Sequence, residues 1–272
     1  MRFRLWGVCV LAALALGALG ASNAMAAHEL PEWGRCVKLE TGKAGAYTGP
    51  TCLKVAGPNQ LGHYEWVPVG ATEKLSFTAT GLETTLTSLG HPTVKCIDAN
   101  ITGEYIGPKT ASVSIEFQGC TDQQGKQCQS PPGVNKSEIT AKTVEAVLGY
   151  TRNEIVNGKH VIAAGIDLKP QSPLTSLFTY ECNESGEMAT VEGSVIGQLK
   201  PINKMTAETI ATFRTTKAFA QVPEKFQDEP KDTLSTTFMK GLETVGTVPS
   251  SLAIVGEKGT NSAPVEVKAQ GV

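Results

Sequence analysis

Alternation of apolar and polar residues is the dominant pattern along this chain. It is clearest over residues 110–118, where Ala111, Val113, Ile115 and Phe117 occupy every second position and hydroxyl, amide or carboxylate side chains lie between them. Because successive side chains of a β-strand point to opposite faces, this pattern predicts a strand with one buried and one solvated face.

Weaker alternation predicts strands elsewhere in the chain. These runs are residues 74–80, 82–89, 93–97, 139–148, 177–182, 188–196, 207–214 and 234–239. Asn157-Gly158 between two apolar pairs predicts a two-residue type I′ hairpin turn, since both residues accept positive φ. Helical periodicity is confined to a short stretch at 171–177. The expected fold is all-β, an antiparallel β-sandwich or a flattened barrel, with a disulfide-pinned N-terminal arm.

The first 26 residues have the three parts of a secretory signal. Arg2 and Arg4 precede an apolar run over residues 5–19, and Ala24-Met25-Ala26 supplies a small-x-small cleavage site. The run is too short and wrongly flanked for a stable membrane span. We therefore expect a mature chain that begins at Ala27 or His28, is secreted to the extracellular space or the cell envelope, and has no membrane span.

Cysteine usage agrees with export. Seven cysteines occur, and Cys9 lies in the predicted signal. The other six, an even number that favours disulfides in an exported protein, are Cys36, Cys52, Cys96, Cys120, Cys128 and Cys182. Six cysteines allow 15 pairings. Closeness in sequence favours Cys36–Cys52 and Cys120–Cys128, which leaves Cys96–Cys182. The spacings fit neither a zinc site nor a redox Cys-x-x-Cys motif.

The mature chain divides by composition into two parts. Residues 27–60 are glycine-rich with little alternation, and we interpret them as a cysteine-bridged arm on a β-rich body over residues 61–272. Residues 45–50 resemble 103–108, and Gly-Leu-Glu-Thr occurs at both 81–84 and 241–244. An internal duplication would make the body two tied sub-sandwiches, but the two repeats have different offsets, so chance repetition of turn sequences stays open.

Charge excludes some partners. The formal net charge is −2, and the predicted signal contains two arginines and no acids, so the remaining chain carries −4. A mildly acidic chain without a basic run is a poor ligand for nucleic acid or anionic lipid. We expect neither partner.

The common catalytic motifs are missing from the sequence. His-Glu-x-x-His, Gly-x-Ser-x-Gly and a phosphate-binding loop do not occur, so we expect no metal and no cofactor. A carboxylate pair for glycoside hydrolysis could come from Glu104, Glu116, Glu181, Glu184, Glu187 and Glu192, although acids on solvated strand faces are expected anyway. The histidines that flank predicted strands, His63, His91 and His160, are interpreted as structural.

One aromatic pair is a candidate binding platform. In His63-Tyr64-Glu65-Trp66, alternation places Tyr64 and Trp66 on one strand face. If exposed, the two rings could stack on a sugar or on an apolar partner surface; if buried, they are core residues.

Several segments resemble a known family. Pro31 to Val37 (PEWGRCV) looks like the mature start of exported proteins from soil actinobacteria. The likeness continues, in order, through residues 64–66, 82–84, 93–96, 103–110, 118–120, 128–130, 148–150, 193–196, 201–205 and 223–226, with a local departure at 169–173. That family has no assigned activity. The resemblance therefore implies an exported six-cysteine β protein and transfers no site residue.

These observations favour a secreted or envelope-associated non-enzymatic module that contacts a polysaccharide, a surface or a protein partner. A secreted glycoside hydrolase with a carboxylate pair is one alternative. An exported inhibitor that presents the loop between Cys120 and Cys128 is another.

Overall fold

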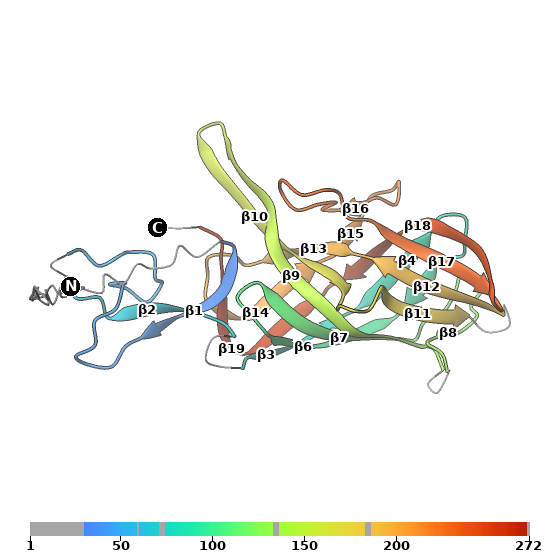
Figure 1. The fold of residues 1–272 in the computed structure, drawn as a ribbon, viewed down its shortest axis with the longest axis horizontal. Helices are drawn as coiled ribbons and strands as arrows, with labels where there is room; N and C mark the ends of the chain where they lie inside the picture. Colours follow the sequence, from blue (N-terminus) through green and yellow to red (C-terminus); the bar gives the residue numbers. More distant parts are fainter. Residues whose placement is uncertain (1–29, 59, 71–73, 133–135, 183–185, 271–272) are drawn as a thin grey trace, which may run out of the picture.

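The structure is a computed structural model that describes residues 30–58, 60–70, 74–132, 136–182 and 186–270. The predicted signal, His28 and Glu184 lie outside these residues. Nineteen strands and no helix form over the described part of the chain, so the all-β expectation is confirmed. Figure 1 shows an elongated molecule with β1 and β2 at one end and β8, β11 and β12 towards the other.

Eight antiparallel strands close on themselves and form what we call the first barrel. In spatial order these are β14 (Thr206–Thr212), β13 (Val195–Lys200), β10 (Lys159–Pro170), β9 (Glu138–Val156), β7 (Thr110–Gln118), β6 (Asp98–Tyr105), β3 (Ser76–Gly81) and β19 (Lys258–Lys268). Pairing of β14 with β19 completes the ring. Closure removes the exposed sheet edges that invite aggregation.

A second sheet of seven strands is almost closed, and we call it the second barrel. Its order is β5 (Val94–Cys96), β4 (Glu83–Ser88), β18 (Glu243–Val255), β17 (Leu234–Lys240), β12 (Glu187–Gly193), β11 (Ser176–Cys182) and β8 (Cys128–Gln129). Thr121 forms isolated bridges to Lys95 on one edge and to Gln127 beside the other. One residue thus spans the seam between the two short edge strands.

The hydrophobic pattern places the core inside the barrels. Along β7, alternate residues from Ala111 to Phe117 are buried, as the sequence predicts. The Asn157-Gly158 turn is also confirmed: both residues have positive φ, and Val156 pairs directly with Lys159. The β9–β10 hairpin tip projects beyond the barrel in Figure 1. The short helix expected at 171–177 is wrong, because residues 171–175 form a turn and β11 begins at Ser176.

The N-terminal arm continues the first sheet. Its strand β1 (Glu32–Lys38) pairs with β19 on one side and with β2 (Tyr64–Pro68) on the other. The predicted Cys36–Cys52 disulfide forms within this arm. The arm is therefore held by backbone pairing to the barrel as well as by its own bridge.

The other two predicted disulfides are wrong. The structure joins Cys96 to Cys120 and Cys128 to Cys182, each with a Cα–Cα separation of 3.9 Å. Cys128 and Cys182 are direct register partners on β8 and β11. Cys120 and Cys128 are also neighbours, since the Cys128 amide donates to the Cys120 carbonyl at 2.9 Å, yet each sulfur bonds across to another strand. Which cysteines form a disulfide in this sheet depends on which strands are adjacent, and closeness in sequence does not determine it.

The repeated Gly-Leu-Glu-Thr segments have different structural roles. Gly81 ends β3 in the first barrel and leads into β4 of the second, whereas Gly241 lies in the β17–β18 turn within one sheet. The described residues contain no helix with the length and apolarity needed to span a membrane.

Candidate functional site

A short hairpin is fixed to the side of the second barrel. It consists of β15 (Arg214–Thr215) and β16 (Gln221–Val222), and Figure 1 shows it close to where the two barrels meet. Phe213, which is buried, accepts a backbone hydrogen bond from Ile254 at 3.1 Å. The Gln221 side chain donates to the Leu252 carbonyl at 2.9 Å and accepts from the Leu252 amide at 3.1 Å. These contacts anchor both strands of the hairpin on β18.

The hairpin turn presents an aromatic ring. Thr216 organises it: its carbonyl accepts from the Phe219 amide, and its hydroxyl accepts from the amides of Ala218 and Ala220. Phe219 has a φ of 62°, a left-handed conformation that is rare for a bulky residue, and its side chain is 56% exposed. Such a strained position persists only when surrounding bonds over-determine it, and it is often functional.

Two surface grooves flank Phe219. One, of about 320 Å³, is lined by the 87–91 turn, with His91 among its residues. The other, of about 380 Å³, runs between Phe219 and a wall that contains Ser194, Lys231, Asp232 and Thr247. We call the second one the hairpin groove. It combines one exposed aromatic ring with hydroxyl, ammonium and carboxylate groups.

A second carboxylate, which is not among the groove-lining residues, lies near the Ser194–Asp232 pair. The Ser194 hydroxyl donates to Asp232 Oδ1 at 2.6 Å. Asp167 of β10 lies beside both; it is only 8% exposed, and its Oδ1 accepts no hydrogen bond from the described residues. Burial, together with the charge of Asp232, raises the pKa of Asp167 to about 7, and Lys169 and the Ser194 hydroxyl act in the opposite direction. Asp167 is therefore partly protonated at neutral pH.

The loop after β16 holds Asp232 in place. The ring of Phe226 is buried and lies so close to Gly149 that a Cβ there would be 2.7 Å from it. The amide of Gln227 donates to the Tyr150 carbonyl at 2.7 Å. This loop thus packs on the outer surface of the first barrel, near the outward-facing Asp167. The polarity of the loop gives no sign of this contact except through Phe226.

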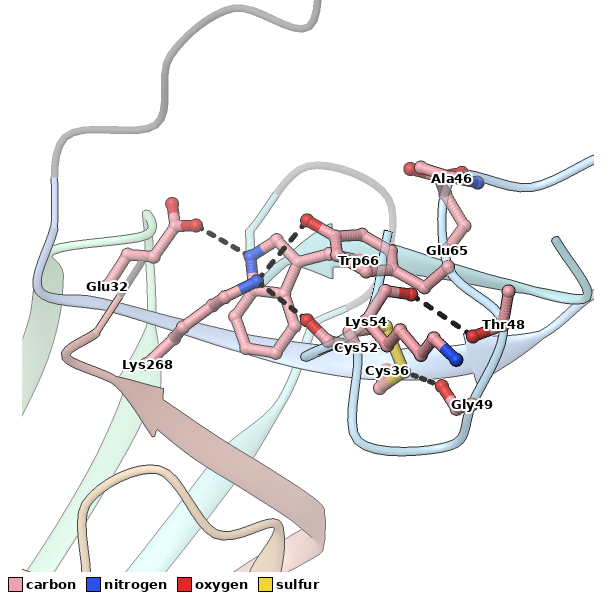
Figure 2. Close-up of a disulfide and its surroundings, with 11 residues drawn as sticks. Glu32, Cys36, Ala46, Thr48, Gly49, Cys52, Lys54, Glu65, Trp66 and Lys268 are labelled. Carbon is pink, nitrogen blue, oxygen red and sulfur yellow. Dashed lines mark hydrogen bonds between the residues drawn. A yellow bond between two sulfur atoms is a disulfide. The ribbon is translucent and has the colours of Figure 1, made fainter. Parts of the chain in front are cut away.

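Tyr64 and Trp66, on β2, pack against Tyr47 and Cys52 of the arm. Trp66 is 5% exposed, and its Nε1 donates to Glu32 Oε1 at 2.6 Å. Figure 2 shows the Lys268 ammonium beside the Trp66 ring, 4.6 Å from the ring centroid and 3.3 Å from the Cys52 carbonyl. Tyr64 is half-buried against the same cluster. The Trp66 ring therefore already packs against groups inside the protein. A binding role for Tyr64 and Trp66 stays a prediction.

The carboxylates named from the sequence are dispersed. Glu104 pairs with Lys74 at 3.6 Å, Glu181 accepts from Gln129 at 3.5 Å, and Glu192 accepts from Thr237 at 3.1 Å. The acids that do converge, Asp167 and Asp232, are far apart in the sequence and carry no local motif.

The histidines have separate surroundings. His91 stacks on Phe238 with a centroid separation of 3.5 Å, and His160 contacts Asn153 Oδ1 at 2.6 Å. Within the described ranges, no cluster of three or more His, Cys, Asp or Glu residues is arranged to hold a metal ion.

No protein-family model, curated protein or solved structure matches this chain. The resemblance to exported actinobacterial proteins stays a prediction. The function of this protein is therefore inferred from the geometry of the hairpin groove and of the Ser194–Asp232 pair in its wall.

Proposed function

We propose that this protein is a secreted, non-enzymatic module that binds a carbohydrate polymer in the hairpin groove. The observation that carries the proposal is the exposed ring of Phe219 on a rigid turn, facing a wall with Ser194 and Asp232. Three disulfides support an oxidising, extracellular location.

The chemistry of the groove suits a sugar. A pyranose ring has an apolar C–H face, which can stack on an aromatic side chain, and a rim of hydroxyls. A carboxylate accepts hydrogen bonds from such hydroxyls more strongly than a neutral oxygen does. Because the turn already fixes Phe219, binding orders little additional structure.

Calorimetric titration with a panel of soluble polysaccharides tests the proposal. Phe219→Ala should weaken binding about tenfold, since stacking on an aromatic ring of this type contributes about 1–2 kcal/mol. Leu242→Ala is the matched control, because Leu242 is 97% exposed on the distant β17–β18 turn. Equal losses in both variants, or no binding by the wild type to any glycan, would refute the proposal.

A second candidate is glycoside hydrolysis by the pair of acids. Asp167, with its raised pKa, has the character of a general acid, and Asp232, whose Oδ1 accepts from Ser194, is the second carboxylate of the pair. Reducing-end release from the same panel distinguishes the two functions. Release that is abolished by Asp167→Asn and by Asp232→Asn would establish the enzyme; binding without release supports the module.

A further inference from the structure

The interior of the first barrel is incompletely filled. An apolar cavity of about 50 Å³ lies inside it. Its wall includes four alanines from four different strands, Ala79, Ala111, Ala146 and Ala211, where larger side chains would close the space. Eight-stranded barrels are just wide enough either to be filled by side chains or to hold one small ligand. The small side chains here leave room for one small ligand.

Different groups lie towards the two ends of the cavity. Trp33 of the arm pairs with Val267 near the end of β19 and packs edge-on against Tyr105, with ring centroids 5.0 Å apart. Glu257 precedes the start of β19, so it lies towards the opposite end of the barrel. The cavity is thus bounded by an aromatic plug at one end and by a carboxyl group near the other.

One carboxyl oxygen of Glu257 has no hydrogen-bond donor among the described residues. Its side chain is 7% exposed, it lines the cavity, and its enclosed Oε2 accepts no hydrogen bond from any described residue. Burial raises the pKa of Glu257 to about 8, so the group is mainly uncharged at neutral pH. A buried polar oxygen without a donor is unfavourable, and a ligand that donates a hydrogen bond would remove this penalty.

Water and cations are poor occupants of this space. An enclosed water needs two to four polar partners, and the surroundings of Glu257 are otherwise mainly apolar. An alkylammonium would need to lose its hydration in exchange for a single carboxylate partner. A neutral alcohol meets neither difficulty, because its hydroxyl can donate to one carboxyl oxygen and accept the carboxyl proton.

We propose that the first barrel binds a short aliphatic alcohol, with the hydroxyl on Glu257 and the hydrocarbon among the four alanines. At about 10–15 Å³ for each water-sized group, the cavity accommodates about four non-hydrogen atoms. 1-Propanol has this size. The site is separate from the hairpin groove and does not depend on carbohydrate binding.

Methyl NMR on alanine-labelled wild-type protein tests the proposal directly. 1-Propanol should cause saturable shifts at Ala79, Ala111, Ala146 and Ala211 and none at Ala189, which is buried in the second barrel. 1-Chloropropane has the same number of non-hydrogen atoms but no donor, so it should bind about tenfold more weakly. Unsaturable shifts, equal affinities or tighter binding of propylammonium would overturn the proposal.

Three variants separate the roles of the carboxyl group and the cavity. Glu257→Gln keeps a donor and an acceptor and should retain the preference for the alcohol, whereas Glu257→Met should abolish or reverse it. Ala146→Val should weaken both ligands by filling space. Phe219→Ala should leave propanol binding unchanged, so failure of the carbohydrate proposal is distinguishable from failure of this one. If Glu257→Met does not fold, the two-ligand comparison in wild type still decides the question.

Discussion

The two barrels are closed by different means. In the first, every neighbouring strand pairs with the next, and β14–β19 completes the ring through backbone hydrogen bonds. In the second, the edge strands β5 and β8 have three and two residues, and the seam between them is spanned by Thr121. Both disulfides of the body, Cys96–Cys120 and Cys128–Cys182, lie at this seam. Covalent bonds are found where the backbone pairing is incomplete.

The interiors differ as well. The first barrel is lined mainly by apolar residues and has one buried carboxyl group without a donor among the described residues. The second contains a chain of hydroxyls: Ser88 donates to Thr236 at 3.1 Å, Thr236 lies 2.7 Å from Ser250, and Ser250 donates to Ser88 at 2.9 Å. These three hydroxyls satisfy one another, whereas Oε2 of Glu257 in the first barrel has no donor among the described residues.

Removal of the Cys128–Cys182 disulfide should have the largest effect on stability. Cys128→Ser/Cys182→Ser should lower the free energy of unfolding by about 4 kcal/mol, because the bond closes a 54-residue separation. Hydrogen exchange should accelerate in β11 and β12 and stay slow in β9 and β10, since backbone pairing closes the first barrel. The control Cys36→Ser/Cys52→Ser should accelerate exchange in the arm only, and the pairing of β1 with β19 should persist. Equal acceleration in both barrels would contradict the difference in closure.

The buried carboxyl group of the first barrel should make stability depend on pH. The pKa of Glu257 is raised from 4.5 to about 8 in the folded state, so the folded protein holds a proton that the unfolded chain releases. The contribution of this proton to the free energy of unfolding is fully present below pH 4.5 and declines as the pH rises towards 8. We expect a loss of about 3 kcal/mol between about pH 5 and pH 8.

Denaturant titrations of wild type and Glu257→Gln at several pH values measure this contribution. Asp167, with its pKa raised to about 7, acts in the same direction in both proteins, so the difference between them isolates Glu257. If the free energy of unfolding changes with pH by the same amount in the two proteins, Glu257 is solvated and the account is wrong.

The hydroxyl chain of the second barrel should have the smallest effect. Thr236→Val keeps the shape of the fully buried side chain but removes the hydroxyl that contacts both Ser88 and Ser250. The loss should be about 1 kcal/mol, measured by denaturant titration. Thr237→Val is the matched control, because the Thr237 hydroxyl is on the opposite, more exposed side of β17. A larger loss in the control would show that the chain contributes little.

Local features of this fold are predictable from the sequence, and long-range ones are not. Alternation located β7, and Asn157-Gly158 located the β9–β10 turn, because each depends on neighbouring residues only. Strand order and barrel closure depend on pairing between distant segments such as β14 and β19, for which local alternation has no signal. The wrong disulfides have the same origin, since the partner of Cys128 is set by the register of β8 with β11.

The candidate site illustrates the same limit. Asp167 occupies a position that alternates with the inward-facing Ile166 and Leu168, so only its outward direction is predictable. Its approach to Asp232 depends on how the loop containing Phe226 packs on Gly149. Glu257 comes directly after a glycine in what looks like an ordinary charged turn, and its burial is a consequence of barrel closure.

Peptide mapping of the unreduced protein tests the seam of the second barrel most directly. Trypsin cleaves after Lys126, which separates Cys120 from Cys128. Mass spectrometry should therefore find the peptide with Cys96 joined to the one with Cys120, and the peptide with Cys128 joined to the one with Cys182. A linked pair containing Cys120 and Cys128, or alkylated thiols at these four positions, would contradict the account.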